Sequence, residues 1–211
     1  TSCLVGSEMC IRDRIDPDHH KNSSNAALGL LMGNMYQKRK GRSWDLRKQS
    51  IELWPKWIEL LREFNHELNI EKPLIQLTTN EEKFKKLERF INETNDLNLQ
   101  ILKRDSIFIK NINKTFQTKN IKGMISFKDG RIDATTLLKT LNKYLKNRKV
   151  NFLEDEIIRI DKLKNQWIAT SKNNKKIVSD IVILCNSLNT INLLNSFAHN
   201  IKLKPVLGQA I

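Results

Sequence analysis

The chain has 211 residues, 39% of them hydrophobic, and its 37 Lys and Arg against 23 Asp and Glu give a formal net charge of +14. This length is enough for one large domain or two small ones, and the lack of any apolar run of about 18 residues excludes an ordinary membrane-spanning helix. Three cysteines, at positions 3, 10 and 185, form neither a disulfide framework nor a paired metal-ligand spacing, so a reducing, cytoplasmic setting is expected.

The positive charge allows two interpretations. It is compatible with a basic domain that associates with nucleic acid. The lysines are, however, spread along the chain and enriched together with Asn and Ile, the residues that AT-rich codons favour. We therefore interpret the charge as genome composition and solvated surface, and we expect no nucleic-acid partner.

The first 14 residues, TSCLVGSEMCIRDR, have neither a helix or strand period nor the composition of a signal peptide. The stretch GSEMCIRDR looks like the translation of a sequencing-adapter read, so we interpret residues 1–14 as an artefact in which Cys3 and Cys10 carry no biology. His19 and His20 follow on a polar loop. Adjacent side chains rarely converge on one ion and no third ligand lies nearby, so no metal site is predicted.

The next stretch, Ser23 to Met32, begins with two hydroxyls and an amide and continues with small residues into an apolar run. This pattern predicts a capped helix start. The free N–H groups of such a start suit a phosphate or an electron-rich ring edge, and the small residues allow a flat cofactor to approach the backbone. An ordinary capped helix without a ligand explains the same pattern.

From Gly41 to Leu68 the apolar residues follow a helical period, with Pro55 expected to start a new helix or to kink this one. The tryptophans in this stretch are expected to be core, with stacking on a ligand or on nucleic-acid bases as the alternative. Leu74–Thr78 alternates as a strand, and Asn80 is expected to cap a helix over about residues 81–93. The Asn-rich residues 92–100 are interpreted as a connection, and the apolar residues near 107–109 are left unassigned.

The stretch from Ile121 to Ile160 predicts a strand, a tight turn at Asp129-Gly130, a helix and further strands, which suggests a parallel crossover. Residues 166–170 and 176–178 then predict a small hairpin. The continuous apolar run 180–185 predicts a buried strand, in which Cys185 is a small buried residue or, alternatively, a redox thiol. A polar turn, a helix from Thr190 to about 197 and a strand entry at 204–209 complete the chain.

Five of these pieces resemble, in the same order, the FAD-dependent D-amino-acid oxidase and glycine oxidase family. They are SSNAALGLLMG, DGRIDATTLLKTLNKYL, NFLEDEIIRI, the hairpin with DIVILCNSLNT, and KPVLGQ. The resemblance covers about residues 23–209, and the order of the pieces is more specific than any one of them.

The resemblance implies an α/β fold, with a partial FAD-binding domain of the Rossmann-like, glutathione-reductase type. A three-stranded β-flap and part of an α+β substrate domain accompany it. On this reading residues 15–40 and 121–200 are parts of the FAD-binding domain. Residues 41–120 belong to the substrate side, and 201–211 begin the entry to the substrate domain.

The resemblance also implies which residues contact FAD. By position these are Ser23, Ser24, Leu28, Gly29 and Leu30 at the diphosphate and flavin ring, Ile157 at the adenine, and Cys185 and Asn186 where a strand returns to the flavin. The family's glycine-rich crossover and its ribose-binding acidic residue are expected before residue 15, and the arginine that holds a substrate carboxylate is expected beyond residue 211.

The function implied by the resemblance is oxidation of an amino acid or related amine by hydride transfer to flavin. The partner is then a small-molecule amine, no catalytic acid or base is assigned, and the oligomeric state is open. A basic nucleic-acid-associated domain is the alternative. A third interpretation, compatible with the first, is that these 211 residues are an inactive fragment that does not fold alone.

Overall fold

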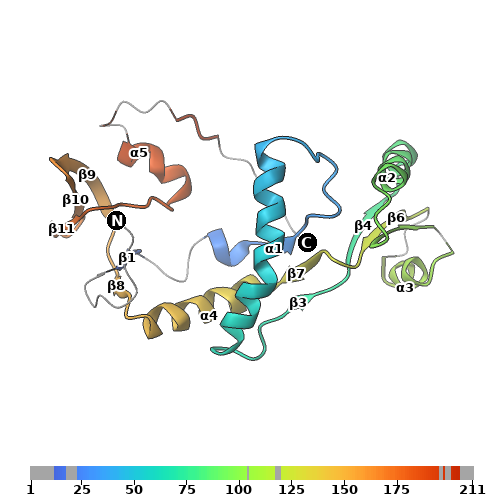
Figure 1. The fold of residues 1–211 in the computed structure, drawn as a ribbon, viewed down its shortest axis with the longest axis horizontal. Coiled ribbons are helices and arrows are strands. Elements are labelled where there is room, and N and C mark those ends of the chain that lie inside the picture. Colours follow the sequence, from blue (N-terminus) through green and yellow to red (C-terminus); the bar gives the residue numbers. More distant parts are fainter. Residues whose placement is uncertain are drawn as a thin grey trace. The chain divides into compact units, whose positions relative to one another are not determined.

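The computed structural model describes residues 12–17, 23–103, 105–116, 120–194, 197 and 201–204, and Figure 1 shows their course. By its internal contacts the chain divides into two compact units. One is the 24–144 unit. The other, the two-segment unit, combines Thr1–Ser23 with Leu145–Ile211. Residues 24–40 and 121–144 therefore pack with 41–120 in one unit.

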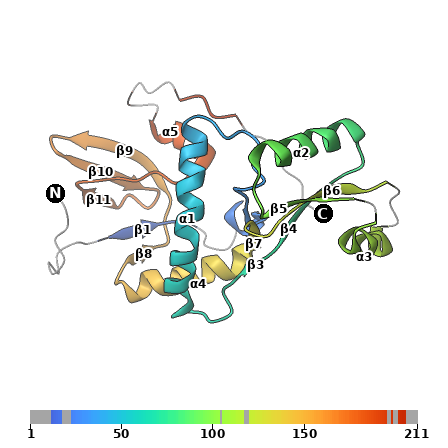
Figure 2. The ribbon, with the colours of Figure 1, turned by 45° about the vertical axis from the view of Figure 1, so that its right-hand side comes forward.

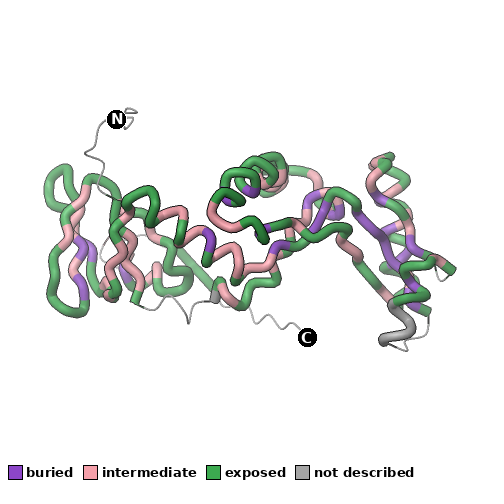
Figure 3. Tube along the Cα trace, turned by 90° about the horizontal axis from the view of Figure 1, so that it is seen from below, coloured by how far each residue is buried: buried purple, intermediate pink, exposed green. Residues whose placement is uncertain are grey.

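The 24–144 unit contains an antiparallel sheet in the order β4-β6-β5, with bounds Leu74–Thr78, Lys122–Ser126 and Leu99–Leu102. The central strand β6 is buried continuously from Gly123 to Ser126 because helices cover both faces. Figure 3 shows this buried stretch in the part of the unit that holds β4, β5 and β6. Helix α2, Glu81–Thr94, lies on one face, and helix α3, Ile107–Phe116, lies on the other (Figure 2).

Helix α2 forms as the sequence predicts. The side chain of Asn80 accepts a hydrogen bond from the backbone N–H of Lys83 at 2.8 Å and so caps the first turn. Three apolar side chains, at a spacing that keeps them on one face, are buried against the sheet: Phe84, Leu87 and Phe90. The cap and the apolar face together determine where the helix begins and how it lies.

A second sheet in the same unit has the order β2-β7-β3, with bounds Leu30–Leu31, Gly130–Ile132 and Ile70–Glu71. Its inner face packs against helix α1, Arg42–Arg62, and helix α4, Ala134–Asn147, in a core that contains Ile58, Leu61, Leu68 and Ile132. No new helix begins at Pro55, which lies inside a continuous α1. An interior proline costs about 3 kcal/mol, and burial of two large apolar side chains, at about 1.5–3 kcal/mol each, offsets that cost.

In the two-segment unit, strand β1, Asp13–Ile15, pairs in parallel with β8, Asn151–Leu153. Three antiparallel strands follow, β9, β10 and β11, spanning Ile157–Leu163, Gln166–Ser171 and Lys176–Ser179. The predicted hairpin of β10 and β11 is thus confirmed, and with β9 it forms a three-stranded sheet, as the resemblance implied for the flap. The short helix α5, Thr190–Leu194, contacts β9 and follows the 3-10 turn η2, Ser187–Asn189.

Three expectations are corrected. Strands β6 and β7, on either side of the Asp129-Gly130 turn, belong to different sheets, and β8 pairs with β1, so β7, α4 and β8 are not a crossover within one sheet. The Asn-rich connection ends within β5, whose first two residues it contains, and the apolar residues near 107–109, which the sequence left unassigned, begin α3. Asp13 and Arg14, which were assigned to an artefact, form two thirds of β1.

The apolar run 180–185, predicted as a buried strand, differs most from the sequence prediction. It is an extended segment outside the described strands, with Ile181 and Ile183 77% and 81% exposed. Cys185 is exposed as well, where the sequence predicted a buried residue. Hydrophobicity favours burial, but a strand becomes buried only when neighbouring strands pair with it. His19, His20, Cys3, Cys10 and the strand entry beyond Lys204 lie outside the described residues.

Candidate functional site

The segment from η1 into β2 holds five of the predicted cofactor residues. Its first residues form a single 3-10 turn, η1, Ser23–Ala26, in which the N–H of Ala27 donates to the carbonyl of Ser24 at 3.2 Å. The predicted capped helix is therefore one short turn, because the chain must become extended to pair with β7. Ser24 is exposed at this turn.

Gly29 makes the close approach that brings this segment against β7. Its φ is +67°, and a Cβ at this position would collide with the carbonyl oxygen of Ile132. The N–H of Ile132 donates to the carbonyl of Gly29 at 2.9 Å. A residue with a side chain would be strained here and would also separate the two strands.

The ladder fixes the direction of the Leu30 backbone. In an antiparallel ladder, hydrogen-bonded and non-hydrogen-bonded pairs alternate. Gly29 and Ile132 are a hydrogen-bonded pair, so the next pair, Leu30 with Arg131, is not. The N–H of Leu30 therefore points away from β7, toward the open edge of the sheet at β2. This donor is oriented for a group that lies beside the sheet edge.

Side chains of this segment alternate between core and surface. Leu31 packs against the core beneath the sheet. Leu28 and Leu30 are 53% and 47% exposed, so two large apolar side chains flank the backbone of Gly29 on the surface. An apolar surface around an outward N–H suits a flat, largely apolar ring with a hydrogen-bond acceptor at its edge.

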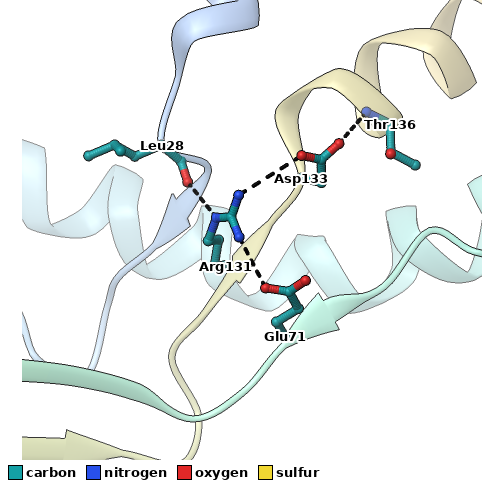
Figure 4. A network of polar contacts seen from close by, with 5 residues as sticks. All are labelled: Leu28, Glu71, Arg131, Asp133 and Thr136. Carbon is teal, nitrogen blue, oxygen red and sulfur yellow. Dashed lines mark hydrogen bonds and ion pairs between the residues drawn. The ribbon is translucent and has the colours of Figure 1, made fainter. Parts of the chain in front are cut away.

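Arg131 ties this segment to its neighbours on the outer face of the sheet (Figure 4). Its Nε donates to the carbonyl of Leu28 at 3.3 Å, and its guanidinium forms ion pairs with Glu71 at 3.3 Å and with Asp133 at 3.9 Å. Asp133 also accepts a hydrogen bond from the N–H of Thr136 at 2.6 Å and so caps α4. That hydrogen bond, with smaller contributions that include the nearby charge of Arg131, lowers the pKa of Asp133.

A buried carboxylate that the sequence assigned only to a turn holds the loop after β2. Asp129 is 1% exposed, and its two oxygens accept hydrogen bonds from the backbone N–H groups of Gly33, Asn34 and Met35 at 2.8, 2.9 and 2.7 Å. The N–H of Asp129 donates in turn to the hydroxyl of Ser126 at 3.1 Å. Neighbouring residues give no sign of this role, because the partners lie 94–96 residues away in the chain.

The loop borders a surface groove of about 620 Å³ next to β4. Most of its lining is apolar, with amide and ammonium groups added by Gln37, Gln76 and Lys38. The apolar and aromatic lining residues include Leu30, Met32, Met35, Tyr36, Leu74, Ile75 and Leu77. Leu30 thus belongs both to the groove and to the segment with the outward N–H.

The other predicted cofactor residues lie in the two-segment unit. Ile157 begins β9, where it pairs with Ser171. Cys185 lies on the extended segment before η2, and Asn186 precedes η2 and accepts a hydrogen bond from the hydroxyl of Thr190 at 2.6 Å. Ser23 is the first residue of η1. Leu28, Gly29 and Leu30 therefore lie together on the surface of the 24–144 unit. In the two-segment unit, Ile157 lies at the start of β9, whereas Cys185 and Asn186 lie just before η2.

One further acidic residue was missed. Asp16 directly follows β1, at the carboxyl end of a strand in a parallel pair, and its N–H donates to the carbonyl of Leu153 at 3.1 Å. Its carboxylate accepts a hydrogen bond from Arg14 at 2.8 Å. Ligands of open parallel sheets bind at the carboxyl ends of the strands. The signal in the sequence was an acidic residue just after a short strand, concealed by the assignment of residues 1–14 to an artefact.

The structure also bears on metal binding and on membrane insertion. Over the part of the chain that the structure describes, no group of three or more His, Cys, Asp and Glu side chains is arranged to hold a metal ion. Within the same part, none of the helices is long and apolar enough to cross a membrane.

Comparison with known proteins decides the family. The model of a family described as FAD dependent oxidoreductase (DAO) matches residues 13–211. This chain belongs to the FAD-dependent oxidoreductase family. The match begins at Asp13, in agreement with the start of β1 and two residues before the boundary expected from the sequence. A search of the curated proteins found no match.

Solved structures of the same fold include two oxidases and a deaminase. Glycine oxidase from Geobacillus kaustophilus has a TM-score of 0.69 at 19% identity, and the alignment covers 86% of this chain and 50% of that one. Iminodiacetate oxidase from Chelativorans sp. BNC1 gives 0.69 at 14% identity, covering 86% and 50%. L-Amino acid deaminase from Proteus myxofaciens gives 0.68 at 15% identity, covering 89% and 42%.

These likenesses show the fold. The α/β class expected from the sequence, with a partial Rossmann-like FAD-binding domain, is confirmed. The chain spans about half the length of these solved proteins.

Proposed function

We propose that the protein is an FAD-dependent oxidoreductase that oxidises an amino acid or a related amine. The observation that carries this proposal is the family match, which runs from Asp13 to the last residue. Bound FAD would supply the acceptor for a hydride from the α-carbon while the substrate nitrogen loses a proton; water would then convert the imine to a carbonyl compound, an oxo acid for an amino-acid substrate, with release of ammonia or an amine. The glycine, iminodiacetate and amino-acid enzymes of the same fold support this substrate class.

The residues of the 24–144 unit fit the flavin ring. We assign the contact to Leu28, Gly29 and Leu30, because Gly29 allows the backbone to lie close to β7 and the N–H of Leu30 points outward. The exposed side chains of Leu28 and Leu30 would exclude water from the ring edge. Arg131 holds the carbonyl of Leu28 and so orients the N–H groups that follow. Ser24, exposed on the turn before this segment, is assigned to the diphosphate together with Ser23.

The adenosine half of the cofactor is assigned to the two-segment unit. Ile157, at the start of β9, is proposed to receive the adenine on its backbone. Asp16, at the carboxyl end of β1, is proposed as the acidic residue that accepts the ribose hydroxyls. This assignment replaces the expectation that such a residue lies before residue 15. Cys185 and Asn186 are proposed to approach the flavin. A cytoplasmic setting stays a prediction from the cysteine count.

The test is reduction of the full-length protein without oxygen. The protein, loaded with FAD, is mixed with a panel of small amino acids and amines, and the flavin absorbance is followed. The proposal predicts that at least one member of the panel bleaches the oxidised flavin bands, and that admission of oxygen or another electron acceptor restores them. A protein that binds FAD but is reduced by no amine or amino acid in the panel would contradict the proposed substrate class.

The basic nucleic-acid-associated domain is not proposed. Its support in the sequence is the net charge of +14 and the tryptophans, and the family match does not point to nucleic acid.

A further inference from the structure

The loop from Met32 to Tyr36 is held on its N–H side by a buried carboxylate. Asp129 accepts the N–H groups of Gly33, Asn34 and Met35. Hydrogen bonds to a charged acceptor are stronger than neutral ones, and a buried charge is tolerated when such bonds satisfy it. Because Asp129 lies between β6 and β7, the loop is fixed to the junction of the two sheets.

The carbonyl side of the same loop is held by two arginines. Nη1 of Arg47, on α1, donates to the carbonyl of Met32 at 2.7 Å. Nη2 of Arg39 donates to the carbonyl of Asn34 at 2.6 Å. The two guanidinium groups therefore bind carbonyls at positions interleaved with the N–H groups that bind Asp129. Cations and the carboxylate hold opposite poles of the same peptide groups.

Aromatic rings keep the two arginines in place. The guanidinium of Arg47 lies over the ring of Tyr36 at 4.1 Å, and that of Arg39 lies over Trp44 at 5.5 Å and Phe90 at 5.0 Å. The rings of Tyr36 and Trp44 are stacked, with centroids 6.3 Å apart and an interplanar angle of 9°. Cation–π contacts of this kind restrict long side chains that otherwise sample many rotamers.

The loop from Met32 to Tyr36 lies next to both the proposed flavin contact and the groove. It directly follows β2, where the outward N–H of Leu30 lies, and it supplies Met32, Met35 and Tyr36 to the wall of the groove. A shift of the loop would move Leu30 and the groove wall together. A site that binds tightly needs its contacting residues held by a second set of interactions.

We propose that Asp129 is a positioning residue for the flavin-contacting segment 28–30, with Arg39 and Arg47 holding the following loop from the opposite side. The inference rests on the proposed function. Asp129 itself is not expected to touch the cofactor, because its oxygens are directed at the loop backbone.

The experiment compares Asp129→Asn with Thr140→Val in the full-length protein. Thr140 is a suitable control because it is buried in the same unit, and its hydroxyl accepts a hydrogen bond from the side chain of Asn65 and donates to the carbonyl of Thr136 on its own helix. FAD affinity is measured by fluorescence titration, the position of the flavin absorbance bands by spectroscopy, and stability by thermal unfolding. Amide hydrogen exchange at Gly33, Asn34 and Met35 reports on the loop in the absence of FAD.

We expect Asp129→Asn to raise the Kd for FAD about tenfold, as loss of one charge-assisted hydrogen bond would. It should also shift the flavin bands and speed exchange at the three amides. Thr140→Val should lower the unfolding temperature while the Kd and the bands stay at wild-type values. Equal changes of Kd in the two variants would show a purely structural role and overturn the proposal, as would a wild-type Kd in Asp129→Asn.

A second variant covers the case in which Asp129→Asn does not fold. Arg47→Lys keeps the charge on a partly exposed side chain but loses the planar group that donates to Met32 while it lies over Tyr36. It should raise the Kd for FAD about threefold, less than Asp129→Asn, because the lysine ammonium keeps a charged donor for the carbonyl of Met32 and only the planar geometry is lost. An unchanged Kd would overturn the proposal. Failure of the wild-type protein to bind FAD is a different result, because it removes the proposed function itself.

Discussion

Replacement of Gly29 by alanine tests the close approach of the flavin-contacting segment to β7. Two penalties add at this position. The φ of +67° is left-handed and costs roughly 1–2 kcal/mol for a residue with a Cβ. The new methyl group would also meet the carbonyl of Ile132, so the hydrogen bond between Ile132 and Gly29 must break, at about 0.5–1.5 kcal/mol.

The sum is a loss of roughly 1.5–3.5 kcal/mol in the free energy of unfolding, before any adjustment of the buried Ile132. Gly41→Ala is the matched control. Gly41 also has a positive φ, +82°, but a Cβ there meets nothing within 4 Å. It carries the backbone strain without the collision, so its loss should be roughly 1–2 kcal/mol.

The assay is urea unfolding of the full-length protein with and without FAD, together with FAD titration of each variant. Gly29→Ala should lose more stability than Gly41→Ala and should bind FAD more weakly, whereas Gly41→Ala should bind it as the wild type does. If the two variants lose the same stability and bind FAD equally, Gly29 does not lie against Ile132 and the reasoning fails.

Three further predictions concern the same unit. Leu30→Ala, at a half-exposed position, should change the free energy of unfolding by less than about 0.5 kcal/mol but weaken FAD binding. Leu31→Ala should lower the free energy of unfolding by roughly 2 kcal/mol, because Leu31 packs against the core. A larger loss for Leu30→Ala than for Leu31→Ala in urea unfolding would contradict the assigned faces of β2. Asp133 has a lowered pKa, so its stabilisation is present above its ordinary pKa of 3.8 and is lost as the pH falls through the folded value. In Asp133→Asn the unfolding free energy should therefore fall less steeply between about pH 4 and pH 2, and identical slopes in the two proteins would argue against the helix-capping bond. Met124→Ala, at a fully buried position of β6, should cost about 2–5 kcal/mol in thermal or urea unfolding, and a loss below about 1 kcal/mol would mean that the sheet is not packed on both faces.

The elements that the sequence predicted well are those specified by local chemistry. Asn80 capped α2 as expected, because a cap and an amphipathic face lie within one stretch of chain. The hairpin of β10 and β11 was found because its turn contains Asn174, which adopts a positive φ of 59°. In both cases the residues that determine the structure are close together in the sequence.

The elements that were missed depend on distant partners. Leu99 and Leu102 are buried in β5 only because β6 lies beside them, and the Asn-rich sequence before them indicated a connection. Three consecutive apolar residues begin α3 without a helical period, and of these Ile109 is the one that is fully buried. The exposed Ile183 shows the opposite error, since an apolar run predicts burial without showing which strands would cover it.

The residues of the candidate site fall into the same two groups: those that the local sequence reveals and those that only the fold reveals. Gly29 and the neighbouring Leu28 and Leu30 could be located in the sequence, because small and apolar residues follow two serines there. The family resemblance then suggested that they contact the flavin. Asp129 could not, because only the fold reveals that its carboxylate meets N–H groups of the loop after β2. Arg47 likewise gave no signal, since an arginine on a helix is usually solvated and its carbonyl partner lies 15 residues away.

We infer that Leu28, Gly29 and Leu30 form part of a surface that binds FAD. The most direct measurement is the visible absorbance of the full-length protein, purified as expressed and again after incubation with FAD and removal of the unbound cofactor. The account predicts flavin bands that stay with the folded protein, at one equivalent per chain. A folded protein that shows no flavin bands before or after the addition of FAD would contradict it.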